Sequence, residues 1–125
     1  MRLDDVKVLY HAGRYDGAVY LCGYVLEIAL KARICKLLDL TEYPLEGKFK
    51  QTYATHDFSV LLKLSGLENQ ILLSKTKQPD LFISWSLVTG WYPAMRYEIL
   101  NKSKKEVGDI LVALIDILKW LKKSW

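Results

Sequence analysis

Residues 14–33 read RYDGAVYLCGYVLEIALKAR, an almost unbroken apolar segment with the periodicity of a helix. Three charged residues, Asp16, Glu27 and Lys31, lie among the apolar ones. A surface helix would place its charges on one side, and a membrane-spanning helix would exclude them. The segment therefore predicts a central helix that carries polar groups near the core of a bundle, and these groups need partners from the rest of the chain.

The bulk composition is that of a soluble globular protein. The chain has 125 residues, of which 51% are hydrophobic and 26% are charged. This length predicts one domain, residues 1–125, with a core that needs no metal or disulfide. Cys22 and Cys35 fall on the same predicted helix, too far apart to bond to each other, and we expect both to be reduced core residues. With no cleavable leader or membrane span recognisable, we expect a cytoplasmic protein.

Helical periodicity continues along most of the chain, and no alternating strand pattern of useful length occurs. Asp16 should cap the long helix, and Gly13, Gly66 and Gly90 should end three others. We expect helices at about residues 6–12, 16–38, 55–66, 67–75, 81–90 and 102–123, with a loop at 41–55 that could cover a site. The core positions of the long helix should be Ala18, Leu21, Cys22, Val25, Ile28, Ala29, Ala32 and Cys35.

The predicted fold is all-α, an antiparallel bundle of four to five main helices. Its long antiparallel pair should be the helix at 16–38 and the helix at 102–123. The last helix is the clearest, because its apolar residues fill one face without a gap. They are Val107, Ile110, Leu111, Leu114, Ile117, Leu118 and Leu121.

Glu27 and Lys31 permit two interpretations. They are four residues apart with the acid first, which suits an exposed helical ion pair worth only about 0.3–0.5 kcal/mol. Alternatively, a partly buried Glu27 accepts hydrogen bonds from Arg96 or His56 and fixes their geometry, because an unpartnered carboxylate on this apolar helix would be costly.

Two further positions are candidates for chemistry. His56 in THDF is either a hydrogen-bonding residue at a helix start or, beside a carboxylate, an acid or base that works near neutral pH. His11 has less support. Arg96 in WYPAMRY could grip a phosphate with two hydrogen bonds while Trp91 and Tyr97 stack on a base. In the structural interpretation, the two aromatic residues pack between helices and Arg96 pairs with Glu27 or Asp16.

Several kinds of site are not indicated. The two cysteines and two histidines lack metal-ligand spacing, and the glycines match no phosphate-binding loop, so we expect no metal and no cofactor. The net charge is +4, and six lysines lie near the ends of the last helix. These lysines indicate a solvated face, or alternatively a patch for nucleic-acid phosphates. They are Lys102, Lys104, Lys105, Lys119, Lys122 and Lys123.

Three segments together resemble the HEPN family, small helical domains named for nucleotide binding in higher eukaryotes and prokaryotes. GRYDGAVYLCGYVLEIALKARI is similar to the first long helix of that family, THDFSVLLKLSG to its histidine-led short helix, and WYPAMRYEI with the final helix to its closing half. The resemblance implies a homodimer, often encoded beside a minimal nucleotidyltransferase in toxin–antitoxin or defence systems. Many members are metal-independent ribonucleases that use an Arg followed, after four to six residues, by a His.

Arg96 matches the arginine of that motif, but the possible histidine positions hold Asn101, Lys102 and Ser103. The resemblance thus implies a dimeric module that binds a nucleotide, RNA or a nucleotidyltransferase partner, with little or no catalysis. The alternative is a metal-independent ribonuclease toxin that uses Arg96 with His56, or with Asn101 positioning the substrate 2′-hydroxyl. A third possibility is a structural interaction protein in which Glu27, Lys31, His56 and Arg96 only satisfy one another.

Overall fold

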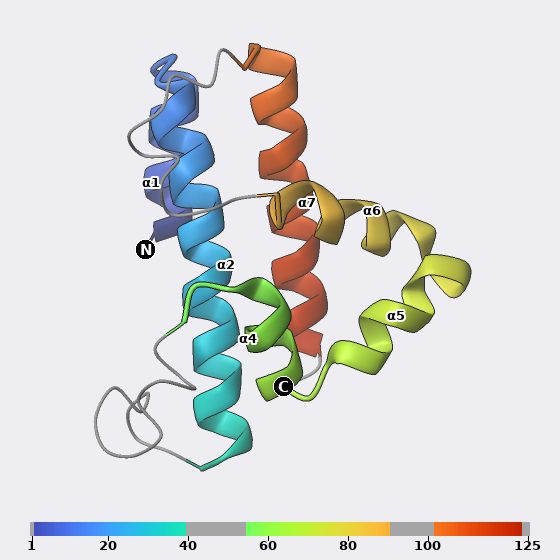
Figure 1. Cartoon of the computed structure of the whole chain (residues 1–125). Helices are drawn as coiled ribbons and strands as arrows, with labels where there is room; N and C mark the ends of the chain where they lie inside the picture. The colour runs from blue at the N-terminus through green and yellow to red at the C-terminus, as the bar shows by residue number, and fades with distance from the viewer. Residues whose placement is uncertain (1, 40–54, 91–101, 124–125) are drawn as a thin grey trace.

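The computed structural model describes residues 2–39, 55–90 and 102–123, and every regular element in these ranges is a helix (Figure 1). The expected all-α bundle is therefore confirmed. The helices are α1 (Arg2–His11), α2 (Tyr15–Leu37), α4 (Phe58–Leu64), α5 (Glu68–Lys77), α6 (Pro79–Val88) and α7 (Lys104–Lys123). None of the helices in these three ranges is long and apolar enough to cross a lipid bilayer.

A tight turn joins α1 to α2. Gly13 adopts a φ of 75°, the left-handed conformation that glycine tolerates best, and the N–H of Arg14 donates to the carbonyl of Leu9 at 2.8 Å. Asp16 lies in the first turn of α2 rather than at its cap, which is Arg14 and has no side-chain capping bond. Its carboxylate is still placed favourably near the positive end of the helix dipole.

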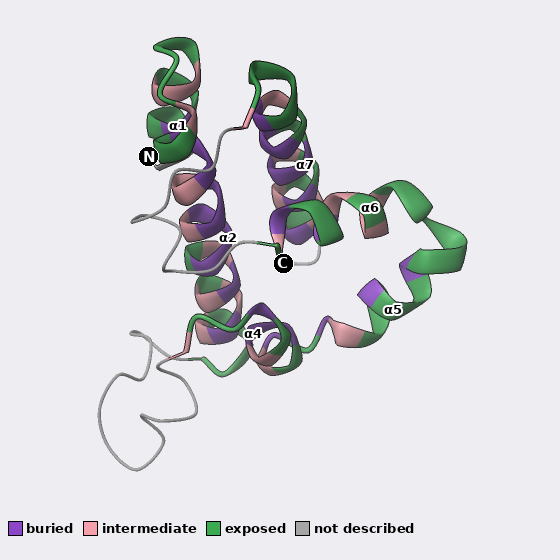
Figure 2. Ribbon diagram, turned by 45° about the horizontal axis from the view of Figure 1, so that its top comes forward, coloured by how far each residue is buried: buried purple, intermediate pink, exposed green. Residues whose placement is uncertain are grey.

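The prediction that the two long helices form an antiparallel pair is wrong. Helices α2 and α7 run side by side in the same direction, whereas α1 and α2 form the antiparallel pair (Figures 1 and 2). Lys102, which precedes α7, and Ile110, in the first half of α7, line one small cavity with Val19 and Cys22 of the first half of α2. The prediction failed because α4, α5 and α6 intervene, and they return the chain to the end of the bundle where α2 begins.

The buried face of α2 also differs in part from the predicted one. Ala18, Cys22 and Val25 are buried as expected, but Ile28 is 42% exposed and Ala32 is exposed. The remaining predicted positions, Leu21, Ala29 and Cys35, are half-buried. The core instead receives Val19, Leu26, Leu30 and Ile34. Because α2 is apolar on nearly every side, the periodicity does not determine which side faces the core.

Helix α7 matches its prediction closely. It buries all the predicted apolar positions except Leu118, which is half-buried. A reciprocal pair of hydrogen bonds caps its N-terminus. The N–H of Glu106 donates to Ser103 Oγ, and the N–H of Ser103 donates to Glu106 Oε1, each at 3.1 Å. This capping box satisfies two backbone donors that the helix itself cannot pair.

The shorter helices α4 and α6 pack against the long ones, α4 on α2 and α6 on α7. Asp57 caps α4 by accepting from the N–H of Ser59 at 2.8 Å, and Gly66, with a φ of 77°, follows its end. Phe58 of α4 meets Trp85 of α6 edge to face, with ring centroids 6.4 Å apart. Helices α5 and α6 form an arm: α6 packs against α7, and α5 lies beyond α6, away from α2 and α7 (Figure 2). Pro79 at the first position of α6 makes the break between them.

Candidate functional site

The middle of α2 holds a buried carboxylate. The Glu27 side chain is only 4% exposed, and it is the charged side chain that is buried in the described part of the chain. Its neighbours along the helix are the core residues Leu26 and Leu30. An ionised carboxylate in such a place is unfavourable unless cations or hydrogen-bond donors compensate it.

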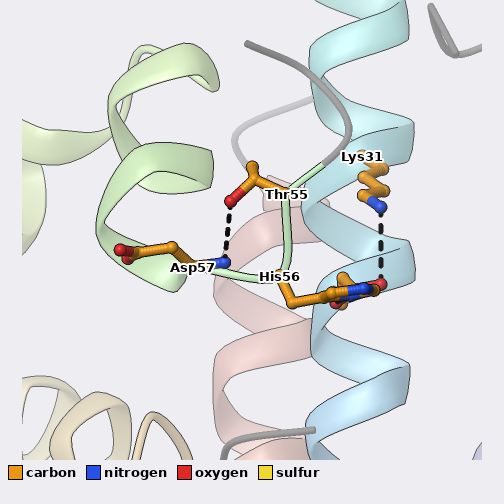
Figure 3. Close-up of polar contacts among 5 residues, drawn as sticks. Lys31, Thr55, His56 and Asp57 are labelled. Atoms are coloured by element: carbon orange, nitrogen blue, oxygen red, sulfur yellow. Dashed lines mark hydrogen bonds and ion pairs between the residues drawn. The ribbon is translucent and has the colours of Figure 1, made fainter. Parts of the chain in front are cut away.

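Two side chains meet this carboxylate from different directions (Figure 3). His56 Nδ1 lies 2.5 Å from Glu27 Oε1, and Lys31 Nζ lies 3.4 Å from Glu27 Oε2. The helical pair and the contact with His56, which the sequence left as alternatives, therefore exist together. We call Glu27, Lys31 and His56 the Glu27 cluster.

The segment before α4 places His56 against α2. The N–H of Asp57 donates to Thr55 Oγ1 at 3.0 Å, and the Asp57 carboxylate then caps α4. Phe58, directly after this cap, is buried beneath the arm. The hydrogen bonds of Asp57 and the buried ring of Phe58 thus hold the backbone that carries His56. The imidazole of His56 contacts Glu27, which lies 29 residues earlier in the sequence.

The chemistry of the cluster follows from which atoms face water. An ionised carboxylate can only accept hydrogen bonds, so Nδ1 of His56 carries the proton in this contact. Nε2 is then the ring nitrogen that is left for a ligand, and the His56 side chain is 58% exposed. Lys31 is 20% exposed. The negative charge is thus buried, the Lys31 side chain is largely covered, and the His56 imidazole is open to water.

A second feature lies at the other end of α2. An open cleft of about 600 Å³ separates the α1–α2 turn from the start of α7. Arg14 and Lys102 bring positive charge to it, and Asp16 brings a carboxylate. Among the residues that the structure describes, Leu9, Gly13, Tyr15 and Gly17 also line it. Because its two basic residues are far apart in sequence, no local motif signals this cleft.

The structure brings together three of the predicted site residues, those of the Glu27 cluster. Arg96, Tyr97, Trp91 and Asn101 lie outside the described residues, as does the predicted loop except for Thr55. His11 ends α1, where its ring contacts Tyr10, and is not part of the cluster. Sequence reasoning missed the supporting role of Thr55, although a Thr two residues before a capping Asp is a known turn-forming pattern.

The basic residues of α7 are at the surface. Lys104, Lys105, Lys119, Lys122 and Lys123 are exposed, and Lys102 is half-buried beside the cleft. No group of three or more His, Cys, Asp or Glu residues gathers anywhere in residues 2–39, 55–90 or 102–123. The Glu27 cluster, with one acidic and two basic members, is therefore the candidate site with the most defined geometry.

Comparison of the chain with protein-family models, with curated proteins and with solved structures found no match. Function is therefore inferred from the residues and contacts described above.

Proposed function

We propose that this protein is a HEPN-like module that dimerises and binds the phosphate groups of a nucleotide or an RNA segment. The observation that carries the proposal is the Glu27 cluster, in which one buried carboxylate contacts two basic side chains, an exposed His56 and a partly exposed Lys31. A minimal nucleotidyltransferase in a toxin–antitoxin or defence system is the proposed protein partner, on the basis of the sequence resemblance.

The arrangement favours an anionic ligand because the acidic group is more deeply buried than the two basic ones. Glu27 is engaged from two sides and buried, so a ligand meets the Lys31 ammonium group and, when His56 is doubly protonated, its Nε2–H donor rather than the carboxylate. Ammonium and imidazole groups are common partners of phosphate oxygens, and they fix the ligand without reading a base sequence. The net charge of +4 adds a long-range attraction for polyanions.

In this proposal the segment WYPAMRY provides the remaining contacts. Arg96 would bind a phosphate through two parallel hydrogen bonds, and Trp91 and Tyr97 would stack on bases. Asn101 would donate or accept at the ribose. Co-purification of the protein with the product of the neighbouring gene tests the proposed partner, and recovery of the chain without it would argue against that part of the proposal.

Binding can be measured by fluorescence anisotropy of a labelled single-stranded RNA and by calorimetry with nucleotides. Lys31→Ala and His56→Ala should each weaken binding by about tenfold or less, as expected for loss of one phosphate contact. Lys119→Ala is the matched control, because it removes an exposed lysine of α7. Circular dichroism should confirm that all variants remain helical. Absence of binding by the wild type, or equal binding by all variants, would refute the proposal.

A second candidate function, metal-independent cleavage of RNA, is favoured by one observation. His56 is oriented through Nδ1 by a buried carboxylate, which is the arrangement that holds a catalytic imidazole in one tautomer. Nε2 would take the proton of a ribose 2′-hydroxyl as its oxygen attacks the adjacent phosphorus. The bond between phosphorus and the 5′ oxygen would break, that oxygen would take a proton from water, and a 2′,3′-cyclic phosphate would remain. Arg96 would stabilise the charge on the phosphate.

This second function has a separate test. The wild type should cleave RNA in the presence of a chelator, whereas His56→Ala and Arg96→Ala should not. A substrate with a single 2′-deoxyribose at the cleavage position should resist cleavage, because it lacks the attacking oxygen. Equal cleavage by the wild type and His56→Ala would assign the activity to other residues or to a contaminant.

A further inference from the structure

The outer face of α5 exposes two large apolar side chains at its centre. Leu72 is 62% exposed and Leu73 is 55% exposed, while Ile71 and Ser74 turn inward and are buried. The helix belongs to the arm that projects from the long pair (Figure 2). Adjacent leucines that stay largely open to water on a folded helix are typical of a contact surface.

We propose that this outer face, formed by Asn69, Leu72, Leu73 and Thr76, binds the same face of a second copy of this chain. The two α5 helices would pack antiparallel across a twofold axis that passes between Leu72 and Leu73. The inference rests on the proposed dimer and assigns the surface that forms it.

The sequence of α5 suits such a twofold axis. Antiparallel pairing about its centre sets Leu72 opposite the partner's Leu73, and Asn69 opposite the partner's Thr76. With about 100° between successive residues, Asn69 and Thr76 fall within about 10° of the middle of the face. The two leucines lie about 50° to either side of that middle line. Each copy therefore presents a symmetric strip, polar at its ends and apolar at its centre.

Charge complementarity supports the antiparallel direction. Glu68 and Lys75 both lie along the same edge of the face, about 90° and 110° from its middle. The twofold axis brings Glu68 of one copy to within two residues, or about 3 Å along the helix, of the partner's Lys75. Symmetry repeats this pair at the other end. Lys75 Nζ lies 5.9 Å from the ring centre of Phe82, at the base of the same arm.

The same arm carries further exposed apolar side chains, Ile83 at 61% and Leu87 at 44% on α6. Even so, a pair of ten-residue helices is a small interface, and small interfaces form dimers that dissociate on dilution. Sedimentation equilibrium of the full chain over a concentration series therefore suits the test. The wild type should show a reversible monomer–dimer equilibrium.

Leu73→Glu should shift that equilibrium toward monomer by about tenfold or more in dissociation constant. Val112→Glu, at a 58% exposed position on α7, is the matched control and should leave the equilibrium unchanged. Glu68→Lys and Lys75→Glu should each weaken the dimer, and the double variant Glu68→Lys/Lys75→Glu should restore it, because the swapped charges attract again.

Each other outcome overturns a defined part of the proposal. If Leu73→Glu leaves the dimer intact, the α5 surface is refuted as the interface, whereas the proposal that the protein dimerises stands. A wild type that stays monomeric at every concentration would refute both the dimer and its surface. Loss of dimer in Leu73→Glu without restoration by the charge swap would refute the antiparallel register. RNA binding, measured separately by anisotropy, tests the proposed function independently of these results.

Discussion

His56 Nδ1 lies 2.5 Å from Glu27 Oε1, and this contact joins the segment before α4 to the middle of α2. A buried carboxylate thereby serves two purposes. It ties together parts of the chain that are distant in sequence, and it orients an imidazole whose other face is open to water. Variants of Glu27 and of His56 should therefore change stability and ligand binding together, because each breaks the contact between α2 and the segment before α4.

Glu27→Gln should lower the free energy of unfolding by about 1–2 kcal/mol. The change keeps the volume but removes the charge that both partners compensate, and water near the exposed partners moderates the loss. Urea denaturation measures the effect. Asp116→Asn, an exposed acid-to-amide change on α7, is the control and should change stability little. Equal stability of the two variants would show that the cluster does not hold α4 to α2.

Cys22 should resist alkylation while the protein is folded. Burial raises the pKa of its thiol from 9.0 to about 12, so the reactive thiolate is scarce at about pH 8.5. Iodoacetamide should label a Cys35→Ser variant only after urea is added, as mass spectrometry would show. Rapid labelling of the native variant would contradict the burial of Cys22.

The same thiol should make the stability of the protein depend on pH. Its pKa is higher in the folded state, so its contribution to stability is complete below pH 9.0 and is lost as the pH rises toward about 12. Thermal unfolding of the wild type against Cys22→Ala, across this range, measures the loss. A difference between the two proteins that stays constant with pH would contradict it.

The capping box of α7 should weaken in acid. The backbone N–H of Ser103, then its side chain, hold the pKa of Glu106 below its ordinary value of 4.5. The resulting stabilisation is present above pH 4.5 and is lost as the pH falls through the lower, folded-state pKa. Glu106→Ala should destabilise the protein at neutral pH, because it removes the acceptor of the Ser103 N–H, and urea denaturation should show that this loss shrinks in acid. A loss that does not change with pH would mean that the ionised carboxylate plays no part in the cap.

Two glycines allow a comparison of backbone strain with crowding. Gly13→Ala should cost about 1–2 kcal/mol from the left-handed backbone alone, since a Cβ there would meet nothing within 4 Å. Gly66→Ala should cost more, because its Cβ would also lie 3.3 Å from Leu37 Cδ2. Chemical denaturation of both variants checks the order, and a smaller loss for Gly66→Ala would contradict it.

Local signals in the sequence predicted the helices well. Gly13 and Gly66 follow helix ends where the sequence predicted them, because the left-handed conformation that they adopt depends on few neighbours. The face of α7 was also predictable, since its polar and apolar sides are cleanly separated. The capping box of Ser103 and Glu106 was readable from its spacing but was not predicted.

Features that depend on tertiary packing were harder to predict. The buried side of α2 was assigned only in part because nearly all of its surface is apolar, and Leu26, Leu30 and Ile34 replaced predicted positions in the core. The direction of α7 relative to α2 depends on how α4, α5 and α6 and the segments between them lead the chain through space. By contrast, Glu27 was identifiable as a residue needing partners, because an acid within an apolar helix has few favourable environments.

The dependence of RNA affinity on salt concentration tests phosphate binding by the Glu27 cluster most directly. For a single-stranded RNA, each phosphate contact contributes about 0.7 to the slope of log affinity against log salt. The double variant Lys31→Ala/His56→Ala should therefore reduce the slope by about 0.7–1.4, while Lys119→Ala/Lys122→Ala should leave it near the wild-type value. An unchanged slope in the Lys31→Ala/His56→Ala variant, with the fold intact, would contradict phosphate binding at this site.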